Sequence, residues 1–261
     1  MKLGVIIPAA GASRRFGNRD KLNEDLGGRP LLHRTVEIFV NHDAPAHIVV
    51  AGPSDENGYD EFKLRHGDKL ALLGVNLCPG GTTHRWETVK AALDHLPDDC
   101  THVAVHDAAR PCASRQLLDR VFAAAAKNDA VIPAIDVSDT LKRVSAETKE
   151  DRDIDPLDAL LGAGGKSNTN VRTVEETVPR ENLVAVQTPQ VFEVGLLRRA
   201  YEQADLSSTD DAGLVERLGE TVAVVEGEPT NIKVTTPGDI RIVMAILGLK
   251  PQKERAAHKR F

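Results

Sequence analysis

A loop of small residues that becomes basic is the first feature of the sequence that could do chemistry. Residues 5–21 read VIIPAAGASRRFGNRDK, an apolar run followed by small residues and then by Arg14, Arg15 and Lys21. Small residues let the backbone approach a ligand, and consecutive amide groups can bind an anion. The glycine spacing of a dinucleotide-binding loop is absent, and the basic side chains suit a compact anion such as a triphosphate. The pattern therefore indicates a phosphate-binding loop after the first strand.

Four later stretches end apolar runs with residues that could complete such a site. They are CPGGTTHRWETV with Gly80, Gly81 and Thr88, VHDAARP with Asp107 and Arg110, VQTPQVF with Thr188, and TNIKVTTPGD with Lys233. Backbone amides and a hydroxyl could read a base edge, and a carboxylate beside a nucleotide could meet Mg²⁺ or a ribose hydroxyl. Ligands of open α/β sheets bind beyond the carboxyl ends of the strands. We therefore expect these stretches to form one nucleotide site.

The elements that must position these residues alternate between short apolar runs and longer amphipathic ones. Apolar runs at 3–9, 47–53, 75–81, 101–107 and 130–137 indicate strands, and the stretches 30–42, 84–96 and 114–128 indicate helices. Continuous apolar strands are buried on both faces, which predicts a doubly wound α/β fold with a mostly parallel sheet. Further strands are expected at 182–192, 222–228 and 231–236, with helices at 194–205, 209–219 and from Pro237 onward. We expect one domain over residues 1–250.

A polar, glycine-rich region interrupts this pattern. The periodicity lapses between Arg143 and Val174, which predicts a protruding arm over about 138–186. Its GAGGKS segment does not make a phosphate-binding P-loop, because that motif requires a glycine where the chain has Leu160. Residues 251–261 read as a basic, solvated tail.

Composition excludes several classes of function. The chain has 261 residues, is 41% hydrophobic and carries a net charge of −6, which argues against nucleic-acid binding because such proteins present a basic surface to phosphates. No apolar run is long enough to span a membrane, so no membrane association is expected. Cys78, Cys100 and Cys112 show no spacing typical of disulfides or zinc sites. We expect a cytoplasmic protein.

Taken together and in order, these stretches resemble one family. The segments PAAGASRR, HDAARP, DTLKR, QTPQVF, TDDA and NIKVTTP resemble those of 2-C-methyl-D-erythritol 4-phosphate cytidylyltransferases of isoprenoid biosynthesis, over nearly the whole chain. The resemblance implies a Rossmann-like nucleotidyltransferase fold and transfer of the cytidylyl group of CTP to 2-C-methyl-D-erythritol 4-phosphate. The products would be 4-diphosphocytidyl-2-C-methyl-D-erythritol and pyrophosphate. It also implies Mg²⁺ as cofactor and a homodimer with shared active sites.

The resemblance assigns a role to each matching residue. It implies that the catalytic residues are Arg15, Lys21 and Lys233. CTP would be bound by Ala9, Ala10, Gly11, Ala12, Ser13, Gly80, Gly81, Thr88 and Asp107, and Asp107 would also be the metal ligand. The polyol phosphate would be bound by Arg110, Thr140, Thr188 and, from a second subunit, Arg180. The chain departs from the family at Ser13, where a glycine is common, in the loop 82–84, which is one residue longer, and in a longer arm.

The implied reaction needs no general base. Its nucleophile is a phosphate oxygen that is already anionic at neutral pH, so catalysis rests on in-line positioning and on positive charge. We therefore expect His106, beside Asp107, and Cys112 to have structural roles. Arg14 is expected to face solvent.

Alternative functions share parts of this pattern. A ribitol-5-phosphate cytidylyltransferase has most of these motifs and remains open. A hexose 1-phosphate nucleotidyltransferase is disfavoured because its loop usually reads GGxGTRL. A catalytically silent nucleotide-binding regulator is disfavoured because Lys21, Asp107 and Lys233 are all present.

Overall fold

The computed structural model describes residues 1–11, 16, 20–151 and 169–250. These residues divide into two compact units, Met1–Ile135 with Val186–Phe261, and Asp136–Ala185. The smaller unit corresponds to the predicted arm.

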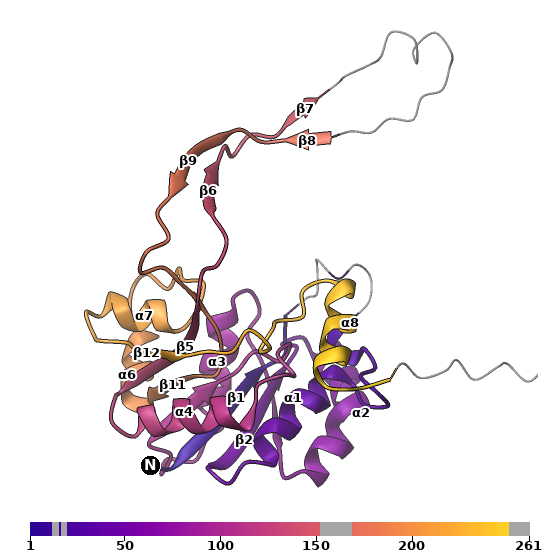
Figure 1. Cartoon of the computed structure of the whole chain (residues 1–261). Coiled ribbons are helices and arrows are strands. Elements are labelled where there is room, and N and C mark those ends of the chain that lie inside the picture. The colour runs from indigo at the N-terminus through magenta and orange to yellow at the C-terminus, as the bar shows by residue number, and fades with distance from the viewer. Residues whose placement is uncertain (12–15, 17–19, 152–168, 251–261) are drawn as a thin grey trace, which may run out of the picture. The chain divides into compact units, whose positions relative to one another are not determined.

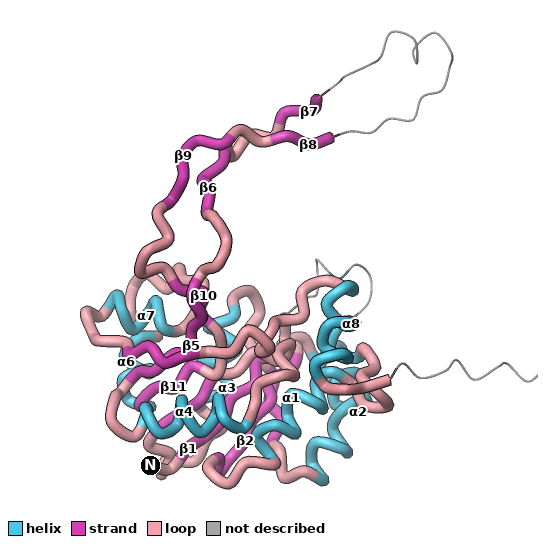
Figure 2. The backbone as a smooth tube through the Cα atoms, in the orientation of Figure 1, coloured by secondary structure: helices cyan, strands magenta, loops and turns pink. Residues whose placement is uncertain are grey.

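An eight-stranded sheet forms the centre of the larger unit (Figures 1 and 2). Its order is β10 (Val184–Val186), β5 (Ala130–Asp136), β11 (Gln190–Glu193), β4 (His102–Val105), β1 (Leu3–Pro8), β2 (Pro45–Gly52) and β3 (Asn76–Pro79), and β12 (Ala223–Glu226) also pairs with β5. Strand β1 is parallel to β2 and β4, β2 is parallel to β3, and β12 is parallel to β5. Strand β11 is antiparallel to β4 and β5. The mostly parallel sheet confirms the predicted fold class.

Helices cover both faces of this sheet. One face packs against α1 (Leu31–Val40), α2 (Glu56–Leu72), α4 (Arg115–Ala125) and α8 (Pro237–Ile246), and the other against α3 (Arg85–Leu93), α6 (Val194–Ala200) and α7 (Ala212–Arg217). Side chains of β1 alternate between the two cores: Val5 and Ile7 lie in the first and Ile6 in the second. This alternation is the period of two expected of a strand.

The start of α8 fixes the segment before it. The Asp239 carboxylate accepts hydrogen bonds from the backbone N–H groups of Thr235 and Thr236, at 2.7 and 2.8 Å. Val234 N–H donates to the carbonyl of Ala109 at 2.8 Å, which ties the segment to the loop after β4. The backbone on the C-terminal side of residue 233 is therefore held at the carboxyl end of the sheet.

Several elements differ from the sequence-based predictions. Helix α2 was not predicted, because its buried side chains, Phe62, His66 and Leu70, form a single row amid polar residues. Residues 231–236, predicted as a strand, form no regular element, since their backbone is used for the contacts to Ala109 and Asp239. The stretch predicted as one strand over 182–192 is two strands, β10 and β11, separated by the cis Thr188–Pro189 bond.

The arm contains paired strands where the sequence pattern indicated none. Strand β6 (Leu141–Val144) pairs antiparallel with β9 (Val174–Val178), and β7 (Lys149–Asp151) with β8 (Thr169–Val171). Arg143 Nε donates to the Glu176 carboxylate across the first pair at 2.5 Å. The GAGGKS segment and the predicted tail lie outside the described residues.

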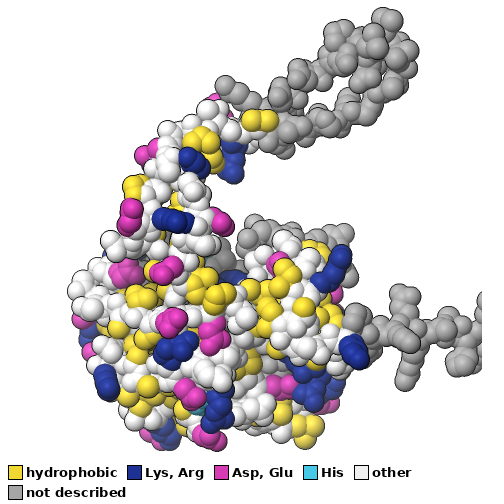
Figure 3. Space-filling view, viewed as in Figure 1, with side chains coloured by type: hydrophobic (Ala, Val, Ile, Leu, Met, Phe, Trp, Pro, Cys, Tyr) yellow, Lys and Arg dark blue, Asp and Glu magenta, His cyan; other side chains and the backbone are white. Residues whose placement is uncertain are grey.

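Charges of both signs are mixed on the surface. On the face of the larger unit seen in Figure 3, Lys and Arg side chains are interspersed with Asp and Glu. Among the residues that the structure describes, no helix combines the length and the apolar character needed to cross a membrane.

Candidate active site

A cavity of about 470 Å³ lies at the carboxyl ends of the parallel strands. It is lined by Pro8, Ala9, Ala10, Gly11, Lys21, Leu22, Gly81, Thr82, Thr83, His84, Arg85, Thr88, Asp107, Ala108, Ala109 and Lys233. Ala9 N–H donates to the Ala51 carbonyl at 2.7 Å, which joins the loop after β1 to the end of β2. Lys21 opens a short 3₁₀ turn, η2 (Lys21–Asn23), in which the Asp20 side chain accepts from Leu22 N–H. Small residues and two lysines thus face the same space.

Two glycines let three loops meet at one side of this cavity. A Cβ atom on Gly80 would lie 2.6 Å from the Gly52 carbonyl oxygen and 3.1 Å from the Cβ of Ala10. A Cβ atom on Gly81 would lie 2.1 Å from the Cβ of Glu87. Neither position has room for a side chain, so this wall of the cavity consists of backbone.

The start of α3 holds the neighbouring loop. Gly81 N–H donates to the Thr88 hydroxyl oxygen at 3.1 Å. The Glu87 carboxylate accepts from the N–H groups of Thr82 and Thr83, at 2.9 and 2.8 Å. These contacts, chiefly that from Thr83, lower the pKa of Glu87. An acidic residue inside the helix thus fixes the loop 82–84.

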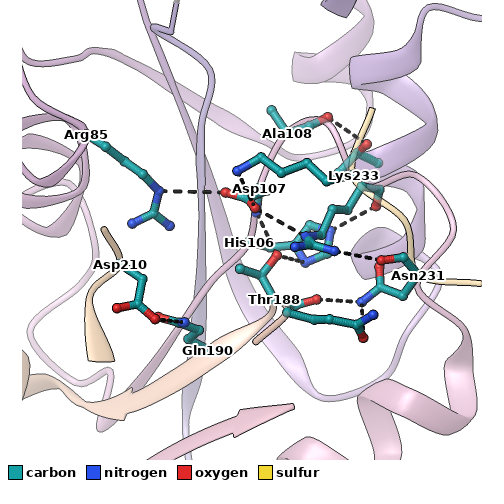
Figure 4. A network of polar contacts seen from close by, with 12 residues as sticks. Arg85, His106, Asp107, Ala108, Thr188, Gln190, Asp210, Asn231 and Lys233 are labelled. Atoms are coloured by element: carbon teal, nitrogen blue, oxygen red, sulfur yellow. Dashed lines mark hydrogen bonds and ion pairs between the residues drawn. The ribbon is translucent and has the colours of Figure 1, made fainter. Parts of the chain in front are cut away.

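Asp107 faces three cationic side chains. Its Oδ2 lies 2.9 Å from Lys233 Nζ and 3.2 Å from Arg110 Nε, and its Oδ1 lies 3.7 Å from Arg85 Nε. In Figure 4, Arg85 and Lys233 approach the carboxylate from opposite sides. Burial alone would raise the pKa of Asp107, but the charges of the three cations outweigh it and hold that pKa well below its usual range. Arg85 also pairs with the Asp211 carboxylate, so the three cations and two carboxylates together carry one net positive charge.

Neutral hydrogen bonds fix the backbone beneath Asp107 (Figure 4). Asp107 N–H donates to the Thr188 hydroxyl oxygen at 3.0 Å, and that hydroxyl lies 3.2 Å from His106 Nδ1. His106 Nε2 lies 3.0 Å from the Arg110 carbonyl oxygen, and the ring is fully buried. Burial lowers the pKa of His106 to about 4. Both ring nitrogens have partners within the fold, so His106 has a structural role.

A second cavity of about 440 Å³ shares a wall with the first. Arg85, Asp107 and Lys233 line both cavities, and Arg110 and Thr188 line the second. Ser208, Thr209 and Asp210 also line the second cavity. Arg110 Nη1 donates to the Asn231 carbonyl oxygen at 2.7 Å, which fixes the orientation of the guanidinium. Two adjoining cavities with cations between them can hold two anionic ligands side by side.

The structure brings together most of the residues singled out in the sequence. Those in the first cavity are Ala9, Ala10, Gly11, Lys21, Gly81, Thr88, Asp107 and Lys233, with Gly80 directly behind; Arg110 and Thr188 line the second. Arg15, Ala12 and Ser13 lie outside the described residues. Thr140 and Arg180 belong to the arm, where both are exposed and Arg180 Nη1 donates to the Ser138 carbonyl oxygen.

Sequence reasoning missed Arg85 and the residues behind it. Arg85 is the first residue of α3 and follows directly after the glycine loop, which is a signal that could have found it. Asp211 and Tyr201 come from distant segments and carry no such signal. Cys112 is a buried free thiol whose pKa burial raises to about 11, which disfavours the thiolate form that a nucleophile needs.

The mostly parallel sheet, with two adjoining cavities beside cationic side chains at its carboxyl end, defines an α/β protein with the architecture of a nucleotide-binding fold. A profile of the 2-C-methyl-D-erythritol 4-phosphate cytidylyltransferase family matches residues 3–154 and 165–249. The chain belongs to this family, and it is therefore a cytidylyltransferase, one of the nucleotidyltransferases.

Individual relatives agree with the family profile. The chain is 38% identical over 245 residues to the 2-C-methyl-D-erythritol 4-phosphate cytidylyltransferase of Rhodococcus jostii, covering 93% of this chain and 94% of the relative. It is 35% identical over 258 residues to that of Alkaliphilus metalliredigens, covering 97% and 96%. The crystal structure of the Thermus thermophilus enzyme superposes with a TM-score of 0.69 at 33% identity, covering 95% of this chain and all (100%) of that one.

Proposed function

We propose that this protein transfers the cytidylyl group of CTP to 2-C-methyl-D-erythritol 4-phosphate, releasing pyrophosphate, in non-mevalonate isoprenoid biosynthesis. The observation that carries this proposal is the sharing of Asp107 by three cations in the wall between two cavities. Two polyanions repel each other, so a site that joins them must supply positive charge where they meet. Family membership implies the two substrates, and the two adjoining cavities support separate binding of each.

The first cavity suits CTP. The N–H groups of Gly80 and Gly81 donate to the Gly52 carbonyl and to the Thr88 hydroxyl oxygen. The wall would therefore meet the cytosine edge with the Gly81 carbonyl and the Thr88 O–H. Lys21, and Arg15 from the preceding loop, would bind the phosphates. Lys233 sits at the shared wall and would meet the α-phosphate.

The second cavity suits the polyol phosphate. Arg110 is held by Asp107 and by the Asn231 carbonyl, so its guanidinium is ordered before a phosphate binds. The substrate's phosphate oxygen would attack the α-phosphorus of CTP from this side, with pyrophosphate leaving toward the first cavity. Lys233 would stabilise the charge that builds on the α-phosphoryl group in transit.

Magnesium fits this site as an ion bound mainly by the triphosphate. Asp107 is the one carboxylate among the described residues that line the first cavity. Mg²⁺ in nucleotide sites is bound through one or two carboxylates together with substrate phosphates. When bound, the ion would neutralise charge on the phosphates, with Asp107 as its protein ligand.

We also propose a cytoplasmic homodimer. The buried, free state of all three cysteines fits a reducing compartment. The arm exposes Val174 and Leu183, which supports contact with a second chain. Thr140 and Arg180 on the arm would then complete the polyol-phosphate site, Arg180 in the neighbouring subunit.

A pyrophosphate-release assay tests the activity. The protein is incubated with CTP and Mg²⁺ and with 2-C-methyl-D-erythritol 4-phosphate, with D-ribitol 5-phosphate, or with no acceptor. We expect release with the methylerythritol phosphate and a much lower kcat/KM with the ribitol phosphate. Preference for ribitol 5-phosphate would assign the alternative acceptor, and CTP binding without release would indicate a silent regulator.

A further inference from the structure

A buried chain of polar groups leads to Arg85 from behind the site. The Tyr201 hydroxyl donates to Asp211 Oδ1 at 2.7 Å, and Arg85 Nη1 donates to Asp211 Oδ2 at 2.5 Å. Tyr201 is 2% exposed and Asp211 is 1% exposed. The three residues come from the end of α6, the start of α7 and the start of α3. No part of the proposed mechanism uses Tyr201 or Asp211.

The far side of the Arg85 guanidinium faces Asp107. Its Nε lies 3.7 Å from Asp107 Oδ1, while Lys233 and Arg110 contact Oδ2. Arg85 therefore stands between two carboxylates and shares the charge of Asp107 with Lys233. The charges of Asp211 and Asp107 outweigh the effect of burial and raise the pKa of Arg85, so the guanidinium stays charged.

We propose that Tyr201 is a positioning residue that, through Asp211, holds Arg85 against Asp107 and so keeps Lys233 available to the α-phosphate. The inference rests on the proposed function. Both oxygens of a buried carboxylate such as Asp211 require hydrogen-bond donors. Asp211 Oδ1 accepts from a neutral donor, which leaves only Oδ2 to bind the guanidinium.

Removal of the Tyr201 hydroxyl would change which donors bind the two oxygens of Asp211. In Tyr201→Phe, Asp211 Oδ1 loses its hydrogen-bond donor. A buried carboxylate oxygen without a partner attracts the nearest remaining donor. The Arg85 fork can then bind both oxygens in the bidentate geometry that arginine favours. Arg85 would turn toward Asp211 and away from Asp107. Lys233 would then be held more tightly by Asp107 and would stabilise the transition state less.

The kinetic test compares Tyr201→Phe with Tyr59→Phe, since these are the two tyrosines of the chain. We expect Tyr201→Phe to lower kcat about tenfold, the size expected from losing one hydrogen bond to a charged group. The KM for CTP should change less than about twofold, because Lys21 and the backbone wall are untouched. Tyr59→Phe on α2 should leave both constants unchanged. Equal kinetics in the two variants would overturn the proposal.

A double mutant separates positioning from a general loss of packing. If Tyr201 acts through Arg85, then Tyr201→Phe should change kcat less than about twofold in an Arg85→Met background. A purely structural role would give the same tenfold loss in both backgrounds and would contradict the proposal.

A crystal structure of Tyr201→Phe provides a test that needs neither turnover nor the Arg85 variant. We expect Arg85 to bind both Asp211 oxygens and to leave ion-pair distance of Asp107. An unmoved Arg85 would refute the inference. If the wild-type protein releases no pyrophosphate with either polyol phosphate, the proposed function fails, while this structure still decides the position of Arg85.

Discussion

Lys233 and Asp107 form an ion pair of 2.9 Å in the wall that two cavities share. The Asp107 side chain is 11% exposed, whereas that of Lys233 is 39% exposed. The carboxylate is thus fixed in the protein, and the ammonium group can exchange part of its contact for a ligand phosphate. The next residue, Val234, is anchored to the Ala109 carbonyl. The backbone is therefore fixed, and only the Lys233 side chain has to move in this exchange.

Replacement of Lys233 by alanine should mainly affect the chemical step. We expect kcat to fall about 10²-fold or more, by analogy with loss of one oxyanion-stabilising donor, with a smaller rise in the KM for CTP. Steady-state pyrophosphate release measures both constants. Lys127→Ala, at an exposed site after α4, is the control and should behave as wild type. Wild-type kcat in Lys233→Ala would show that Lys233 takes no part in catalysis.

Gly81→Ala should impair nucleotide binding without unfolding the sheet. The added Cβ would lie 2.1 Å from the Cβ of Glu87 and 2.8 Å from Thr88 N, so the loop must move. Because this wall is expected to read cytosine, we predict a loss of kcat/KM for CTP of about tenfold or more and a smaller preference over UTP. Gly74→Ala is unsuitable as a control because Gly74 has a φ of +73°. Gly238→Ala, where the nearest atom is 3.7 Å away, is suitable and should retain the preference.

Stability should fall with acid between about pH 6.5 and pH 4 because of buried histidines. Burial, together with the charges of His33 and nearby cations, lowers the pKa of His66 from 6.5 to about 4. Its Nδ1 lies 3.0 Å from His33 Nε2, and its Nε2 has no partner among the described residues. Between pH 6.5 and pH 4, His66 therefore binds a proton in the unfolded chain but not in the folded chain.

The effect can be measured by chemical unfolding at a series of pH values. His66 alone should cost up to about 3 kcal/mol in the free energy of unfolding by pH 4, and none above pH 7. His66→Gln should flatten this dependence in part, because buried His106 titrates in the same range. His95→Gln, at an exposed position, is the control. An unchanged pH dependence in His66→Gln would show that His66 does not contribute.

Mixed dimers test whether Arg180 acts on the neighbouring subunit. We expect homodimers of Lys21→Ala and of Arg180→Ala to be nearly inactive. In a mixed dimer one site would collect both defects and the other none, because the chain with intact Lys21 receives its Arg180 from the partner. Random mixing makes half of the dimers mixed, so about a quarter of wild-type activity should return. No return in co-refolded samples that contain mixed dimers would place Arg180 in its own chain's site or in none.

The parallel sheet and the loops at its carboxyl end could be predicted because their signals are local. Apolar runs mark buried strands, and residues such as Gly81 and Asp107 follow those runs directly. Helix α2 could not be predicted, since one row of three buried side chains in 17 residues is a weak pattern. The strand predicted at 231–236 is absent because its backbone bonds to a loop and not to a neighbouring strand. Val234 is buried as a strand residue would be, but its N–H donates to the Ala109 carbonyl of a loop.

The group behind the site lay beyond sequence reasoning. Arg85 and Asp211 are 126 residues apart, and only the folding of the chain brings their charges into contact. Before that contact is known, Tyr201 is one more apolar position of an amphipathic helix. Local patterns thus predict which residues lie at the carboxyl ends of the strands, but not which distant residues contact them.

The backbone wall at Gly80 and Gly81 has a consequence for inhibitor design. Resistance to an inhibitor usually arises when a side chain in contact with it is exchanged for another. At this wall a new side chain would strike the Gly52 carbonyl oxygen or Glu87 before it reached any ligand. A compound that packs against this backbone therefore meets a surface that mutation can alter only by displacing the loop itself.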